Sequence, residues 1–205
     1  MREQRILNQS LSEVRAVQPE DDGGKPIIEG NGIVLNQRSE KLGFFIEIID
    51  PDSLRDTNFD DAVSLFNHNS DYVLGAFRNK TLELSITREA VRYRSQVPPT
   101  QTIRDLVLTT IDMGYVRGSS FMFSIARNGD DWEEESDGTV IRYVKKIERV
   151  YEMGPVTMPA YSQTTTDIAK RSFDDWIKEF RKNEEKKEVF FRRELARKSL
   201  ELLRV

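Results

Sequence analysis

The sequence predicts an α+β fold: a mainly antiparallel β-sheet or β-barrel core with flanking helices and a C-terminal helical extension. Strand-like segments come first, one helix follows near the centre, more strands come after it, and the last segments are helical. This order does not alternate strictly between strand and helix, as a doubly wound parallel fold would. The 205 residues, 38% of them hydrophobic, are enough for one domain with a genuine core plus appendages.

Changes in composition divide the chain into three segments. Residues 1–25 are polar and end in an acidic run with two glycines, so we expect a flexible segment with nothing to bury. Residues 26–165 contain the strand-like runs and form the expected domain. Residues 166–205 are charged and amphipathic, and Ser172 with Asp175 is a capping signature, so we expect a helical extension there. This extension either packs one apolar stripe on the domain or serves as a docking arm for a partner.

The first strands are predicted from β-branched and aromatic runs bounded by glycine or proline. The runs at residues 27–35 and 43–49 are of this kind, and a shorter apolar run follows at 62–66. Apolar and polar residues alternate at 81–86, which predicts another strand, with 91–93 returning as its hairpin partner.

One helix is predicted in the centre of the chain. Thr102 can cap its start, with Asp105 three residues later as a weak capping-box variant. Four apolar side chains then fall on one face at helical spacing, and Gly114 can end the helix.

Two further strands are expected after this helix. The first covers residues 119–125, and the acidic, turn-rich segment 128–138 is expected to be an exposed connection. A long strand should then run from Thr139 to about Glu152, where Gly154-Pro155 breaks it.

The composition excludes several kinds of chemistry. Without cysteine there is no thiolate nucleophile, disulfide or cysteine-based zinc site, and one histidine cannot build a two-histidine zinc motif. The net charge of −4 gives no electrostatic reason to expect nucleic-acid binding, and no apolar stretch is long enough for a membrane span. The N-terminal residues lack an apolar signal core, which together with the absence of cysteine fits a cytoplasmic protein.

No cofactor or metal ion is expected either. The chain has no phosphate-binding glycine motif, because Gly30-Asn31-Gly32 lacks the third glycine and the following helix. Carboxylates gather at residues 50–61 and 133–135, but neither group has the ligand spacing of a calcium loop. Both are expected to be solvated acidic turns.

One histidine and one serine are the candidate catalytic pair. Any imidazole base from this chain has to be His68, although a lone histidine is often only structural. Two serines open the strand at 119–125. Because side chains alternate along a strand, Ser119 shares the face of Phe121, which should be core, whereas Ser120 lies on the other face and could meet solvent and substrate. Ser120 is therefore the better candidate nucleophile.

Five segments, in their order and spacing, resemble the prohead (procapsid maturation) protease family of tailed bacteriophages, the phage counterparts of the herpesvirus assemblins. The resemblance covers about residues 26–165. The segments are Ile28-Glu29-Gly30 through Val34-Leu35-Asn36; Leu65-Phe66-Asn67-His68-Asn69 with Tyr72-Val73-Leu74-Gly75; Ala90 to Arg94 with Thr102 to Asp105; Gly118-Ser119-Ser120-Phe121 with Phe123; and Glu152 with Pro155-Val156-Thr157 and Pro159-Ala160-Tyr161.

The chain departs from the family pattern at three positions. Ser119 stands where the family usually has Met, Met122 where it usually has Gly, and Gly154 where it usually has Ser. Met122 leaves Ser120 in place but bears on how roomy the adjacent subsite is.

The resemblance implies a serine endopeptidase with a Ser-His-Glu triad. Ser120 would be the nucleophile, His68 the base, and an acidic residue of the closing motif the third member. Glu152 matches that position best, and Glu148, four residues earlier on the same strand, is the competitor. With a single histidine, the chain cannot have the His-His-Ser arrangement of the herpesvirus relatives and needs a carboxylate instead.

The resemblance also implies a role in phage assembly. Such an enzyme would work in the host cytoplasm inside the viral procapsid, where it cleaves the scaffolding segment of the major capsid protein and also itself. Its partners would be that capsid protein and the procapsid interior or portal, with no nucleic acid and no membrane. The alternative is a non-catalytic assembly or scaffold-binding module on the same fold.

Overall fold

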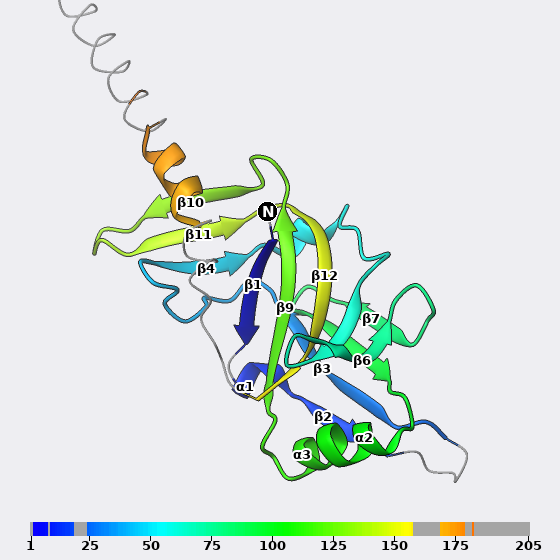
Figure 1. Ribbon diagram of the computed structural model, residues 1–205. Helices are drawn as coiled ribbons and strands as arrows, with labels where there is room; N and C mark the ends of the chain where they lie inside the picture. The colour runs from blue at the N-terminus through cyan, green and yellow to red at the C-terminus, as the bar shows by residue number, and fades with distance from the viewer. Residues whose placement is uncertain (1, 8, 19–23, 158–168, 179–181, 183–205) are drawn as a thin grey trace, which may run out of the picture. The chain divides into compact units, whose positions relative to one another are not determined.

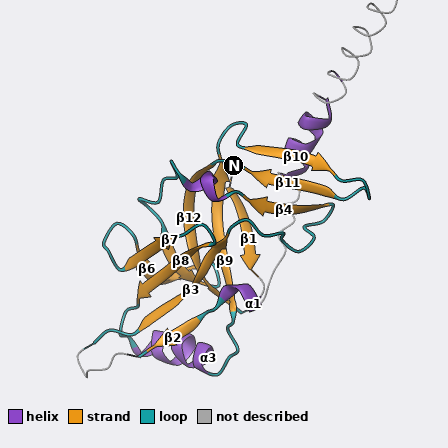
Figure 2. Ribbon diagram, turned by 180° about the vertical axis from the view of Figure 1, so that it is seen from behind, coloured by secondary structure: helices purple, strands orange, loops and turns teal. Residues whose placement is uncertain are grey.

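The computed structural model describes residues 2–7, 9–18, 24–157, 169–178 and 182 of the chain. Contacts divide the chain into two units, residues 1–166 and 167–205. In its described part the first unit is mostly β, with three sheets and a few short helices (Figures 1 and 2). The expected mainly antiparallel sheet architecture is confirmed in this coarse form, but the helices contribute less than an α+β class implies.

A five-stranded sheet carries the candidate catalytic residues, and its strand order is β1-β9-β12-β5-β6. Its neighbours are antiparallel except β12 and β5, which are parallel. The strands are β1 (Arg2–Leu7), β9 (Gly118–Ile125), β12 (Ile147–Val156), β5 (Val63–Phe66) and β6 (Asn69–Ala76). Figure 1 shows β1, β9 and β12 side by side along this sheet.

Two smaller sheets complete the strand content. The four-stranded antiparallel sheet has the order β2 (Arg15–Val17), β3 (Ile27–Val34), β8 (Ala90–Gln96) and β7 (Leu82–Ile86). The three-stranded sheet has the order β10 (Asp130–Glu134), β11 (Val140–Val144) and β4 (Phe45–Ile49), with β11 parallel to β4. The predicted hairpin at 81–93 is confirmed as β7 and β8.

The helices are short and lie between strands. They are α1 (Gln9–Ser12), the 3₁₀ helix η1 (Pro51–Leu54), and one continuous helical stretch made of α2 (Gln101–Ile103), the π-helical η2 (Arg104–Leu108) and α3 (Thr109–Asp112). This stretch is the predicted central helix, and Gly114, with a φ of +71°, follows its end as expected. The predicted cap is wrong by two residues, because the hydroxyl of Thr100, not Thr102, accepts the hydrogen bond from the Ile103 N–H.

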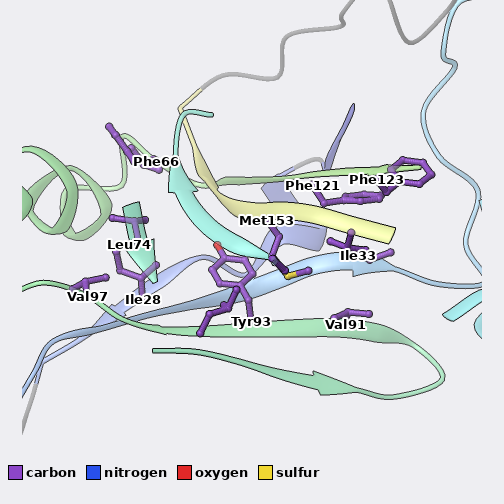
Figure 3. Packing of buried hydrophobic residues seen from close by; sticks show 14 of the residues in the cluster. Ile28, Ile33, Phe66, Leu74, Val91, Tyr93, Val97, Phe121, Phe123 and Met153 are labelled. Carbon is purple, nitrogen blue, oxygen red and sulfur yellow. The ribbon is translucent and has the colours of Figure 1, made fainter. Parts of the chain in front are cut away.

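The core lies between the five-stranded and four-stranded sheets. Phe121 and Met153 from one sheet pack toward Ile33, Val91 and Tyr93 from the other (Figure 3). All five are at most 1% exposed. These side chains hold β9 and β12 on a rigid platform, and burial of each contributes about 2 kcal/mol to folding.

Three predictions between residues 128 and 156 are wrong. The acidic segment at 128–138 is not only a connection, since it contains β10, whose Trp132 is buried and faces the aromatic rings of β4. The single strand expected from Thr139 is two strands, because β11 and β12 belong to different sheets. Gly154-Pro155 does not break β12 either, which continues to Val156 in register with β9.

Residues 2–7 differ from the flexible segment expected at the N-terminus. They form β1, which pairs with β9 over six residues, and the charged side chains of Glu3 and Arg5 are 3% and 5% exposed. A polar composition concealed this strand because the buried groups are ions that neutralise one another. In the second unit, residues 169–178 are helical, so the helix starts before the predicted cap at Ser172. The rest of the predicted extension lies outside the described residues.

Gly154 allows β12 to approach β5 closely. A Cβ at position 154 would overlap the backbone oxygen of Leu65, which cannot move without moving the strand. We expect Gly154→Ala, or the Gly154→Ser that restores the usual family residue, to lower the free energy of unfolding by about 2 kcal/mol. Denaturant unfolding measures the loss.

Gly118→Ala is the matched control, since Gly118 of β9 also pairs with β12, at Val156, but does not face β5. A Cβ there would meet Val156 atoms at 3.1 Å, a contact that a small shift relieves. If both variants lose the same stability, the close approach of β5 and β12 is not what Gly154 provides.

Candidate active site

His68 sits in a two-residue turn that joins β5 to β6. Phe66 pairs with Asn69 across the turn, and both central residues have positive φ, 52° for Asn67 and 59° for His68. Asn accepts this conformation readily, but for His it costs about 1 kcal/mol. The Asn67 N–H donates to the Pro155 carbonyl (3.0 Å), and its side chain bonds Thr157 twice (2.8 and 3.0 Å). The turn is thereby fixed to the end of β12, which holds the imidazole in place.

Glu152 lies on β12 and contacts this imidazole. Its side chain is 8% exposed, and its Oε1 bonds to His68 Nδ1. An ionised carboxylate can only accept, so Nδ1 carries the proton and Nε2 is left as an acceptor. That is the tautomer a general base needs if Nε2 is to take a proton from a nucleophile.

Glu148, the competing carboxylate, has a different partner. It accepts a hydrogen bond from the Ser124 hydroxyl (3.3 Å). No ion pair of Glu148 is found among the described residues. The structure therefore brings Glu152, and not Glu148, to His68.

Ser119 is tied into the core. Its side chain is fully buried, its hydroxyl bonds the Tyr93 hydroxyl (3.1 Å), and its N–H donates to Ser12 (2.8 Å). Burial raises the pKa of Tyr93, so the phenol stays neutral as a partner. This agrees with the prediction that Ser119 faces the core.

Ser120 is also fully buried, which contradicts the expectation that it meets solvent. Strand β1 runs along β9 beside it, and the Ser120 hydroxyl donates to the Arg5 carbonyl at 2.7 Å. The face is nevertheless as predicted. Ser120 and Met122 lie on one face of β9, and Met122 is the register partner of both Glu152 on β12 and Gln4 on β1.

Gln4 joins β1 to the histidine. Its Nε2 lies 2.7 Å from His68 Nε2, the ring nitrogen left without a proton by Glu152. Ser120 and His68 thus share one face of the sheet, but each bonds to β1 and not to the other. Sequence reasoning missed Gln4 and Arg5, because Arg-Glu-Gln-Arg shows no apolar alternation that would indicate a strand.

The other face of β1 carries a buried ionic cluster. Arg5 makes two hydrogen bonds of 2.6 Å to the Glu47 carboxylate of β4. Glu3 accepts two bonds from Arg142 of β11, at 2.6 and 3.0 Å. Arg142 also bonds Asp130 of β10 at 2.8 Å. Glu3, Arg5, Glu47 and Arg142 are all at most 5% exposed.

The pKa values follow from these pairs. Burial alone would raise the pKa of Glu3, but hydrogen bonds and charge from Arg142 and Arg5 outweigh it and lower that pKa. Burial would lower the pKa of Arg5, and the charges of Glu47 and Glu3 reverse the effect and raise it. Glu3 and Arg5 therefore stay ionised, and each depends on its partners because an unpaired buried charge is costly.

Within the described residues, no cluster of three or more potential metal ligands is found. The described helices are all too short or too polar to cross a membrane.

A histidine, a carboxylate and a strand serine are the groups that a serine hydrolase uses. A comparison with known protein families decides which class of hydrolase this is. The model of the Caudovirus prohead serine protease family matches residues 12–179. The chain belongs to this family. It is accordingly a prohead serine protease, which processes the capsid during phage assembly. The resemblance inferred from five short segments is confirmed.

Among solved structures, the prohead protease is similar to the capsid assembly protease gp21 of bacteriophage T4. The identity is 12%, the TM-score is 0.43, and the alignment covers 77% of this chain and 99% of the T4 chain. No curated protein sequence matches significantly.

Proposed function

We propose that Ser120, His68 and Glu152 are the catalytic triad of this prohead protease. The observation that carries the proposal is the bond between His68 Nδ1 and Glu152 on the sheet face that also holds Ser120. Sequence order and strand geometry agree on these three residues, whereas Ser119 and Glu148 have structural partners of their own.

The triad would act by acyl transfer. Nε2 of His68 takes the Ser120 proton as Oγ attacks the scissile carbonyl carbon, and the tetrahedral intermediate collapses when the same proton passes to the leaving amine. Water then hydrolyses the acyl-enzyme in a second round of the same proton transfers. Glu152 keeps the proton on Nδ1 and stabilises the imidazolium that forms in both rounds.

The substrates we propose are the scaffolding segment of the major capsid protein and the protease itself, cleaved inside the procapsid. Family membership supports the setting. Residues 166–205 would supply the route into the shell, as a helical docking arm for scaffold.

A second candidate function is a non-catalytic scaffold-binding module. The observation that favours it is the burial of Ser120 and its bond to the Arg5 carbonyl in place of His68. A chain of this kind would assemble with capsid protein and leave it uncut.

Ser120→Ala distinguishes these two functions. When the variant is co-expressed with the major capsid protein of the same phage, we expect cleavage to fall by about a thousandfold or more, because the nucleophile is gone. Mass spectrometry of every new terminus on both chains measures it. The control is Ser119→Ala, which removes the neighbouring hydroxyl but should retain most cleavage. Unchanged cleavage by Ser120→Ala would disprove the triad.

Glu152→Gln tests the third member. The amide cannot hold the Nδ1 tautomer or stabilise an imidazolium, so we expect the cleavage rate to drop at least about a hundredfold. The matched control is Glu148→Gln on the same strand, which should cost little activity, since the Glu148 side chain bonds only Ser124 among the described residues. A larger loss from the Glu148 variant would reverse the assignment.

Deletion of residues 166–205 tests the docking arm. We expect the shortened chain to be depleted from procapsids assembled with it, because the segment that contacts scaffold is missing. Quantitative mass spectrometry of purified procapsids measures the protease per capsid protein. Encapsidation at the level of the full chain would show that the arm is not the route of entry.

A further inference from the structure

Strand β1 lies across the catalytic residues in the manner of a bound peptide. It pairs antiparallel with β9 from Arg2↔Ser124 to Leu7↔Ser119, at the edge of the five-stranded sheet. The Arg5 carbonyl accepts a hydrogen bond from the Ser120 hydroxyl (2.7 Å), and Gln4 Nε2 is hydrogen-bonded to His68 Nε2 (2.7 Å). A peptide that adds a strand to a sheet edge binds in this way, with backbone pairing for affinity and alternate side chains for specificity.

The family comparison separates β1 from the rest of the domain. The match begins at residue 12, so Arg2–Leu7 lie outside it, whereas β9, β12 and the His68 turn lie inside. The strand that covers the β9 edge in this chain is therefore not part of the family match.

Charged side chains from the neighbouring sheet face the strand that covers this edge. Glu47 and Arg142 are 3% and 2% exposed and come from the three-stranded sheet, and they bind Arg5 and Glu3 respectively through paired hydrogen bonds. Without β1, Arg142 keeps Asp130 and its 3.2 Å bond to Glu47, but Glu47 loses the two 2.6 Å bonds from Arg5. A buried carboxylate that has lost its closest cation favours a ligand that replaces it.

We propose that the β9 edge is the protease's peptide-binding groove. It is selective for an extended segment with a basic side chain that faces Glu47 and an acidic side chain two residues earlier that faces Arg142. In this chain β1 fills the groove and blocks the enzyme. The inference rests on the proposed triad for its link to catalysis. A bound peptide's residue in the place of Arg5 would have its carbonyl at the Ser120 hydroxyl, the proposed nucleophile. A substrate strand would have to displace β1, which frees Ser120 Oγ and His68 Nε2 for each other.

The blocking role is tested on the full chain with a fluorophosphonate, which labels an accessible, activated serine. We expect slow labelling of the unaltered chain and labelling of Ser120 at least about tenfold faster in Arg5→Glu, because breaking a buried ion pair shifts β1 out of the groove. Gln4→Ala, which removes the neutral contact to His68, should also label faster and is the second variant should Arg5→Glu not fold. Arg15→Glu, at an exposed ion pair with Glu29, should label at the unaltered rate. If neither β1 variant labels faster than Arg15→Glu, β1 does not block the site.

The selectivity of the groove is tested without catalysis. A fluorescent peptide with the sequence of residues 2–7 should bind the full-length Arg5→Glu/Ser120→Ala chain, as measured by anisotropy, and the same peptide carrying Arg5→Glu should bind at least about tenfold more weakly because it faces Glu47 with a like charge. Equal binding of the two peptides, or no binding of either, overturns the proposal.

The two assays separate this inference from the proposed function. If the peptide binds selectively but no serine is labelled in any variant, the groove is supported and the triad is refuted. If Ser120 is labelled at one rate in all variants, the triad is supported and the groove is refuted.

Discussion

The pairing of β9 with β12 is the constraint on which the candidate site depends. Its register sets Met122 opposite Glu152 and Ser120 opposite Gly154, so the proposed nucleophile and carboxylate share one face. Gly154 then lets β5 approach closely enough for the following turn to be tied to Pro155. That turn carries His68, which completes a site drawn from three segments far apart in the sequence.

The second edge of β9 is governed by charge. Five charged side chains meet there, two from β1 and three from the neighbouring sheet, and the ion pairs among them offset their desolvation. Such a cluster is stable when complete and costly when one member leaves. The same property that fixes β1 in this structure would make the empty edge selective for a strand that restores the missing charges.

Much of the site was predictable from the sequence, because strand alternation separates Ser120 from Ser119 and a single histidine leaves no choice of imidazole. Choosing Glu152 over Glu148 needed the family pattern, and the strand break expected at Gly154-Pro155 was wrong. Pro155 is accommodated because the turn uses its carbonyl and needs no N–H from it. Strand β1 was not predictable, since burial of Glu3 and Arg5 depends on Arg142 and Glu47, residues more than forty positions away that no local pattern connects to them.

The tautomer of the His68 ring is the most direct test of the proposed triad. The chain has one histidine, so the imidazole nitrogen signals of the ¹⁵N-labelled full-length protein belong to a single ring. At neutral pH the account predicts the tautomer with the proton on Nδ1, hydrogen-bonded to a carboxylate, and loss of that signature in Glu152→Gln but not in Glu148→Gln. A ring protonated on Nε2, or one that is indifferent to Glu152, would contradict the proposed catalytic arrangement.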